Sequence, residues 1–136
     1  MNKNIPNKKL FKYMIIAIIL IVIYSIYKYN TYCLIYYVEN EPPAGTTVWN
    51  TAITVHVKVL NNGNLIYGYS NEKEKLEEDT LKEIRQLVSQ LKEKVKELKQ
   101  DNSATDRFTI NNKTYAVNSL DSEGKEIILK IRNIIY

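Results

Sequence analysis

The hydrophobic pattern begins with an apolar run near the N-terminus. Residues 13–27 read YMIIAIILIVIYSIY and contain no charge, glycine or proline. As a helix this run spans about 22 Å, and extension to residues 10–29 gives about 30 Å, the thickness of a lipid hydrocarbon core. The flanking Lys12 and Lys28 are long enough to extend their charges to the headgroups. The pattern therefore predicts a transmembrane anchor over residues 13–29.

A signal peptide is an alternative for the same run, because it also has a basic region followed by an apolar one. Residues 25–30, SIYKYN, contain no pair of small residues spaced for cleavage. Tyr32 stands where a lipoprotein site needs a small residue before Cys33. We therefore expect an uncleaved anchor, with a cleaved secretory peptide, a lipoprotein and a buried soluble helix as the alternatives.

The lysines around the apolar run indicate its orientation. Four lysines precede the run within residues 1–12, and only Lys28 follows it closely. Positive charge is retained on the cytoplasmic side of a membrane. We therefore expect residues 1–12 to form a basic cytoplasmic tail and residues 30–136 to lie outside the cytoplasm, in a protein that crosses the cell membrane once.

Beyond the anchor the apolar pattern breaks before it resumes. Residues 31–38, TYCLIYYV, suit either a short strand or a continuation of the anchor helix. Residues 39–45, ENEPPAG, disfavour regular structure, because proline lacks an N–H donor and glycine adds backbone freedom. We expect residues 30–45 to form a membrane-proximal segment and stalk, and residues 46–136 to form an extracytoplasmic domain.

Residues 46–70 have the period-two alternation of a β-hairpin. The apolar face of its first strand is formed by Ile53, Val55, Val57 and Val59. The Asn62-Gly63 pair favours a type I′ turn, with Asn61 paired to Asn64 across it. That register predicts that Val59 lies opposite Ile66 on the aliphatic face of the hairpin.

Residues 71–100 follow a helical pattern, with Asn71 as the cap, acidic residues near the start and lysines near the end. The simplest interpretation is a helix packed across the sheet. Its expected length of about 40 Å exceeds what a small sheet needs. Apolar residues also recur three and four apart, as in a coiled-coil seam. We therefore expect residues 72–100 to meet a protein partner or a second copy of the chain through Val88, Leu91, Val95 and Leu98.

The C-terminal part of the chain predicts a second hairpin and a final helix. Residues 107–110 and 113–117 flank an Asn111-Asn112 turn. Residues 119–136 fit either a strand or a helix, with Asp121 or Ser122 as the cap of the helix. A degenerate repeat, in which an Asn-Asn turn precedes an Ile-Arg pair, favours the helix. The predicted fold class is α+β: an N-terminal transmembrane helix followed by a small antiparallel-sheet domain, ββαββα, with one long amphipathic helix.

The charge distribution argues against a nucleic-acid partner. The chain carries 19 basic and 15 acidic residues, but five lysines and no acidic residue lie before residue 39. Residues 39–136 therefore hold 14 basic and 15 acidic residues and are close to neutral. Because no basic stripe is left to follow a phosphate backbone, we expect a lipid bilayer and a protein as the partners.

The sequence offers little catalytic chemistry. His56 is the single histidine and Cys33 the single cysteine, and a histidine in a strand beyond the stalk is poorly placed to activate a membrane-proximal thiol. One histidine and one cysteine do not make a zinc site. The carboxylates of residues 39–41 and 77–79 are interpreted as solvated charge, and the scattered glycines form no phosphate loop. We expect no catalytic, cofactor or metal site, and no enzyme.

Aromatic side chains are the remaining candidates for a contact surface, because they bury much area at a low entropy cost. The candidates are Trp49, Tyr67 and Tyr69. Together with the tether, they predict a non-enzymatic interaction or assembly module outside the membrane, such as an accessory subunit of a bacterial envelope complex. The alternative function is a small-ligand-binding or inhibitor-type sensor with a pocket between sheet and helix.

Overall fold

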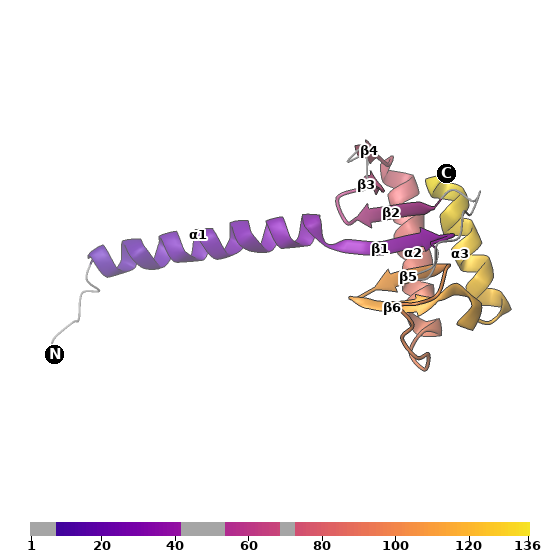
Figure 1. Cartoon of the computed structure of the whole chain (residues 1–136). Coiled ribbons are helices and arrows are strands. Elements are labelled where there is room, and N and C mark those ends of the chain that lie inside the picture. Colours follow the sequence, from indigo (N-terminus) through magenta and orange to yellow (C-terminus); the bar gives the residue numbers. More distant parts are fainter. Residues whose placement is uncertain (1–7, 42–53, 69–72) are drawn as a thin grey trace.

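A long N-terminal helix leads into an antiparallel sheet with two helices on one side (Figure 1). The computed structural model describes residues 8–41, 54–68 and 73–136. The elements are α1 (Lys8–Thr31), β1 (Cys33–Glu39), β2 (Val55–Leu60), β3 (Asn64–Tyr67), β4 (Lys73–Lys75), α2 (Glu78–Lys94), β5 (Arg107–Ile110), β6 (Lys113–Ala116), the 3-10 helix η1 (Val117–Ser119) and α3 (Ser122–Ile135). The predicted α+β class is confirmed.

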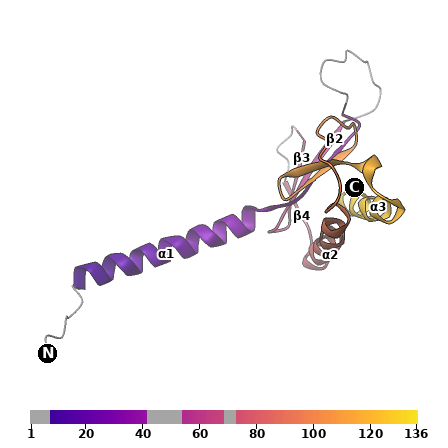
Figure 2. The same cartoon turned by 90° about the horizontal axis from the view of Figure 1, so that it is seen from below.

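Helix α1 extends away from the rest of the chain as an isolated rod (Figures 1 and 2). Its 24 residues span about 36 Å, and none of them is buried against another element. Over residues 13–27 the helix is apolar on all sides, so this part has no polar face to present to water. It is long and apolar enough to cross a membrane, a property that anchors share with signal sequences.

The described strands form one six-stranded sheet in the order β4-β3-β2-β1-β5-β6, with every neighbouring pair antiparallel. Strand β1 lies inside the sheet and pairs with both β2 and β5, so that Tyr37 is opposite Val57 on one side and Phe108 on the other. Only Tyr32 separates α1 from β1.

Of the two alternatives for residues 31–38, the short strand is correct, but residues 33–39 belong to the folded sheet rather than to a stalk. These residues form a strand of the folded sheet, and the domain begins at Cys33 rather than at residue 46. The physical reason is burial: Ile35 and Tyr37 face the helices and are 0% and 5% exposed. Residues 42–45 lie outside the described part of the chain.

The first hairpin differs from its predicted register by one residue. Val59 lies opposite Leu65 rather than Ile66, because the turn between β2 and β3 holds three residues, Asn61 to Gly63, instead of two. Gly63 takes the left-handed conformation, φ +86°, that a three-residue turn requires at its last position. The shift brings Leu65 to the core face, since one step of register exchanges the two faces of a strand.

The second hairpin confirms its prediction. Ile110 and Lys113 pair across a two-residue turn, and Asn111 and Asn112 both have positive φ, 52° and 61°. Two left-handed residues are what a type I′ turn requires, and asparagine tolerates this conformation better than most residues.

Helices α2 and α3 pack side by side against one face of the sheet, where they enclose a single hydrophobic core. Helix α2 has 17 residues, so the predicted helix over residues 71–100 is too long. At its start, residues 73–75 pair with β3 as β4; at its end, Val95 and Leu98 turn back onto the core. The predicted cap Asn71 lies outside the described residues.

The final segment is a helix, as predicted. Asp121 is its N-cap, and its carboxylate accepts a hydrogen bond of 2.7 Å from the Gly124 N–H. The predicted ββαββα order accounts for β2, β3, α2, β5, β6 and α3, but it omits β1 and β4. Four strands therefore precede α2 in the described chain.

Candidate functional site

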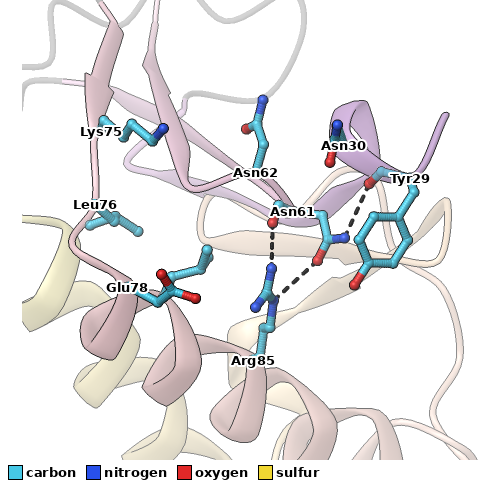
Figure 3. A pocket seen from close by; sticks show the side chains of 9 residues that line it. Tyr29, Asn30, Asn61, Asn62, Lys75, Leu76, Glu78 and Arg85 are labelled. Carbon is cyan, nitrogen blue, oxygen red and sulfur yellow. Dashed lines mark hydrogen bonds between the residues drawn. The ribbon is translucent and has the colours of Figure 1, made fainter. Parts of the chain in front are cut away.

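The junction between α1 and the sheet is held by hydrogen bonds from the turn between β2 and β3 (Figure 3). The last carbonyls of an α-helix have no partner within the helix. Here the Asn61 side-chain amide donates to the Tyr29 carbonyl over 3.1 Å, and the Asn62 N–H donates to the Asn30 carbonyl over 3.2 Å. The Asn61 N–H also donates to the Tyr32 carbonyl over 2.8 Å. A turn far away in sequence therefore caps the end of α1.

Arg85 of α2 fixes this turn from the other side (Figure 3). Its Nε donates to Asn61 Oδ1 over 3.1 Å, and its Nη2 donates to the Asn61 carbonyl over 2.5 Å. Asn61 is 6% exposed and is the one buried polar residue among the described residues. Buried amides need partners for both their oxygen and their nitrogen, and Asn61 has them in Arg85 and Tyr29. The amide thereby connects α2 to α1.

The turn between β5 and β6 meets the same junction from the opposite side of β1. The Tyr32 hydroxyl donates to Asn111 Oδ1 over 2.5 Å, and the ammonium group of Lys92 lies 6.0 Å from the Tyr32 ring centroid. Both Asn-Asn turns therefore contact the segment that follows the apolar helix. The repeated turns were visible in the sequence, but their convergence on one point of the fold was not.

Two pockets lie at this junction. The first, which we call the Arg85 pocket, has a volume of about 390 Å³ and lies between the β2–β3 turn, the segment after β4 and the first turns of α2 (Figure 3). Its lining residues are Tyr29, Asn30, Asn61, Asn62, Lys75, Leu76, Glu78, Leu81 and Arg85. Two cations, one carboxylate and three amide side chains at the helix end make it a polar site that suits a charged ligand.

The second pocket, which we call the Lys92 pocket, has a volume of about 410 Å³ and lies between the end of α2 and the β5–β6 hairpin. Its lining residues are Lys92, Glu93, Val95, Lys96, Ile110, Asn111, Lys113 and Tyr115. Lys96 forms an ion pair with Glu93. Three lysines against one carboxylate give this pocket a positive charge.

The predicted partner contacts on the long helix lie inside the domain. Val88 and Leu91 are 2% and 0% exposed, Val95 is buried, and Leu98 is half-buried against the same core. The helix face that was expected to meet another chain is therefore covered by the sheet and α3. The misleading signal was the spacing, because three-and-four periodicity describes a coiled-coil seam and a helix on a sheet equally well.

Of the predicted aromatic contacts, only Tyr67 lies among the described residues; Trp49 and Tyr69 do not. The Tyr67 hydroxyl lies 3.1 Å from the Ile135 carbonyl and 3.2 Å from the Glu74 carboxylate, and these two acceptors share its single proton. Burial and the neighbouring Glu74 carboxylate raise the pKa of Tyr67. Tyr67 therefore covers the edge of the core and ties β3 to the end of α3.

Cys33 and His56 lie at opposite ends of the β1–β2 pair: Cys33 is opposite Leu60, whereas His56 is opposite Val38. Burial raises the pKa of the Cys33 thiol and so disfavours the reactive thiolate. His56 Nδ1 lies 2.6 Å from the Tyr36 hydroxyl on the sheet face away from the helices. Within the described residues, no three His, Cys, Asp or Glu side chains are grouped as metal ligands.

No family model, curated protein or solved structure matches the chain.

Proposed function

We propose that the chain is a single-pass membrane protein whose sheet domain is a non-enzymatic interaction module outside the cytoplasm. The observation that supports this proposal is the junction: an exposed apolar helix passes into an inner strand of the sheet through one residue, Tyr32. The helix end is hydrogen-bonded to the domain through Asn61 and Asn62, and Tyr32 is bonded to Asn111 on the other side of that strand.

This junction favours a function that depends on orientation. A flexible stalk raises only the effective concentration of a domain near the membrane, whereas a capped junction also restricts its tilt and rotation. Asn61 and Asn62 hold the carbonyls of the helix end, and Asn111 adds an exposed contact to the side chain of the linking residue Tyr32. A fixed orientation benefits contact with a partner that is itself oriented in the membrane, as in an assembly of envelope proteins.

Extraction and labelling in cells test the anchor and its orientation. We expect the full chain to resist extraction with alkaline carbonate. In a Cys33→Ser background, Lys125→Cys places a thiol on exposed α3, and a membrane-impermeant maleimide should label it in intact cells. Release of the chain by carbonate would contradict the membrane anchor. Labelling of the thiol only after cell lysis would contradict the orientation of the anchor.

The interaction role is tested by changing the junction alone. Photo-cross-linking from Lys58, which is exposed on β2, should trap a membrane-associated protein in cells. Insertion of six Gly and Ser residues after Tyr32 keeps the anchor and the sheet but frees their relative orientation. We expect this insertion to weaken or redistribute the cross-links. An unchanged cross-link pattern would show that orientation does not matter.

A small-ligand sensor is the second candidate function, and the Arg85 pocket favours it. The pocket lies between the sheet and α2 and includes Tyr29 and Asn30 from the end of the anchor helix, so a ligand there would contact both parts of the chain. When a panel of small anions and metabolites is added one compound at a time to the purified full chain, a compound that binds this pocket should raise the melting temperature of the chain. A flat response across the panel would count against this alternative.

A further inference from the structure

Positive charge gathers around the end of α1, although residues 39–136 as a whole are nearly neutral. The Arg85 pocket and the Lys92 pocket lie on either side of the helix end and are lined by five cationic and two acidic side chains. We call the five cationic residues the basic collar: Lys75, Arg85, Lys92, Lys96 and Lys113.

The hydrogen bonds at the junction define the depth of these pockets relative to a membrane. The uncharged run ends at Tyr27, and the Arg85 pocket includes Tyr29 and Asn30, about 3–5 Å further along the helix axis. Asn111 of the Lys92 pocket is bonded to Tyr32, a few residues beyond. The headgroup layer extends about 5–8 Å from the hydrocarbon core. The Arg85 pocket therefore begins at the depth of lipid phosphates when α1 spans the bilayer, and the Lys92 pocket borders the outer edge of that layer.

We propose that the basic collar binds the phosphate groups of anionic phospholipids; this inference rests on the membrane anchor of the proposed function. Arg85 directs Nε and Nη2 toward Asn61, and since a guanidinium has five N–H donors, others remain for a phosphate oxygen. Lys92 and Lys113 supply point charges on the other side. The amide side chains of Asn62 and Asn111 add hydrogen-bonding groups to the two pockets.

The acidic residues in the two pockets do not cancel this charge. Glu93 is paired with Lys96, and Glu78 is the single carboxylate in the lining of the Arg85 pocket. A lipid surface fits the arrangement better than one soluble anion, because the two pockets lie on opposite sides of the helix and each would meet a separate headgroup. Helix α3 lies on the far side of the domain from α1 (Figures 1 and 2). Charge changes on α3 can therefore serve as a control for changes in the two pockets.

The proposal is tested with the full chain in mild-detergent micelles, titrated with phosphatidylglycerol or phosphatidylcholine and measured by native mass spectrometry. We expect the chain to bind phosphatidylglycerol more tightly than phosphatidylcholine. Lys92→Gln with Lys113→Gln should weaken phosphatidylglycerol binding at least tenfold, since each lysine near an anionic surface contributes about fivefold. Lys75→Gln should weaken it about fivefold.

A matched control keeps the charge change but moves it away from the junction. Lys125→Gln with Lys130→Gln neutralises two exposed lysines of α3, and we expect it to leave phosphatidylglycerol binding unchanged. Lys92→Arg with Lys113→Arg keeps the charge and should retain binding, which separates a loss of charge from a loss of fold. An equal loss in the control variant would overturn the proposal.

Two further outcomes would also overturn it. Equal affinity of the unaltered chain for the two lipids would show that the collar does not select anionic headgroups. Displacement of phosphatidylglycerol by millimolar inorganic phosphate would indicate a soluble phosphate site instead. Release of the chain by alkaline carbonate would remove the proposed function together with this inference, whereas carbonate resistance without lipid selectivity would remove this inference alone.

Discussion

The two asparagine turns flank the same helix end, yet they have different structures. The turn at Asn61 has three residues, is buried and is bonded to Arg85 and to α1 through backbone and amide groups. The turn at Asn111 has two left-handed residues, is exposed and reaches the junction through the side chain of Tyr32. The same residue type is a buried connector in one turn and a surface group in the other.

The neighbouring helix accounts for this difference. Arg85 lies half-buried in the middle of α2 and covers Asn61. The polar groups of Asn61 are therefore hydrogen-bonded to Arg85 instead of to water. Near Asn111 the closest part of α2 is its last turn, where Lys92 is directed at the Tyr32 ring. Because a hydrogen bond is costly to lose only where water cannot replace it, the two turns are expected to differ strongly in energy.

The largest expected effect follows from Asn61→Ala. The change removes the acceptor of Arg85 Nε and the donor to the Tyr29 carbonyl, while Arg85 Nη2 keeps the main-chain carbonyl of residue 61, and we expect a loss of about 2–3 kcal/mol in the free energy of unfolding. Urea unfolding of the full chain in detergent micelles, followed by near-ultraviolet circular dichroism, measures it. A loss no larger than that of Asn111→Ala would contradict the contrast between the turns.

Gly63→Ala tests the backbone of the buried turn. At φ +86° an L side chain is strained, and the added Cβ would lie 3.3 Å from Leu81 Cδ2. We expect a loss of about 1–2 kcal/mol in the free energy of unfolding. In the exposed turn, Asn112→Gly at φ 61° should cause no loss and a gain of about 0.5 kcal/mol at most. If the two changes had the same sign, the two turn types would not differ as described.

Asp121→Ala extends the comparison to the helices that follow the hairpins. The N-cap Glu77 of α2 makes no side-chain cap bond, whereas Asp121 caps α3 and is paired with Lys94. The Gly124 N–H and the Lys94 ammonium lower the pKa of Asp121 from its ordinary value of 3.8. Its contribution is therefore present above pH 3.8 and disappears as the pH falls through the lower pKa of the folded state.

The corresponding measurement is the melting temperature of Asp121→Ala relative to the unaltered chain at pH 7 and at acidic pH. We expect a lower melting temperature for the variant at pH 7 and a difference that shrinks in acid. Asp121→Asn, which keeps an oxygen acceptor for the Gly124 N–H, should lose less. A difference that grew in acid would contradict the assigned sign.

The smallest expected effect belongs to the exposed junction contact. Tyr32→Phe removes the hydroxyl that donates to Asn111, and water can replace this partner because both residues are exposed. We expect a change below about 0.5 kcal/mol in the free energy of unfolding, measured by the same urea titration as Asn61→Ala. A loss near that of Asn61→Ala would show that both turns are equally important for the junction.

The parts of the fold that were predicted correctly depend on neighbours in sequence. The apolar run of α1, the alternation of residues 107–117 around Asn111-Asn112 and the amphipathic pattern with Asp121 before α3 are each contained in one short segment. The β2–β3 turn shows the limit of this approach, because Asn62-Gly63 fits a two-residue turn locally but takes part in a three-residue turn. Packing of Leu65 and Val59 against the helices favours that register.

The candidate site was harder to predict, because its residues come from α1, β4, α2, β6 and two separate turns. Lys75, Arg85, Lys92 and Lys113 were part of a domain with balanced charge, and no local pattern placed them together. The convergence of two asparagine turns on Tyr29 to Tyr32 was likewise hidden. The single local sign was the repetition of the Asn-Asn pair, which indicated related hairpins but not what they contact.

The amino-acid sequence by itself determined the apolar helix, the α+β class, the second hairpin and the final helix, because hydrophobic periodicity and turn residues act over a few positions. Only the tertiary structure decided that β1 lies inside the sheet, that α2 ends after 17 residues and that basic side chains line two pockets beside the junction of α1 and the sheet. These features depend on which distant segments exclude water from one another, and that arrangement is determined by packing of the whole core rather than by any single segment.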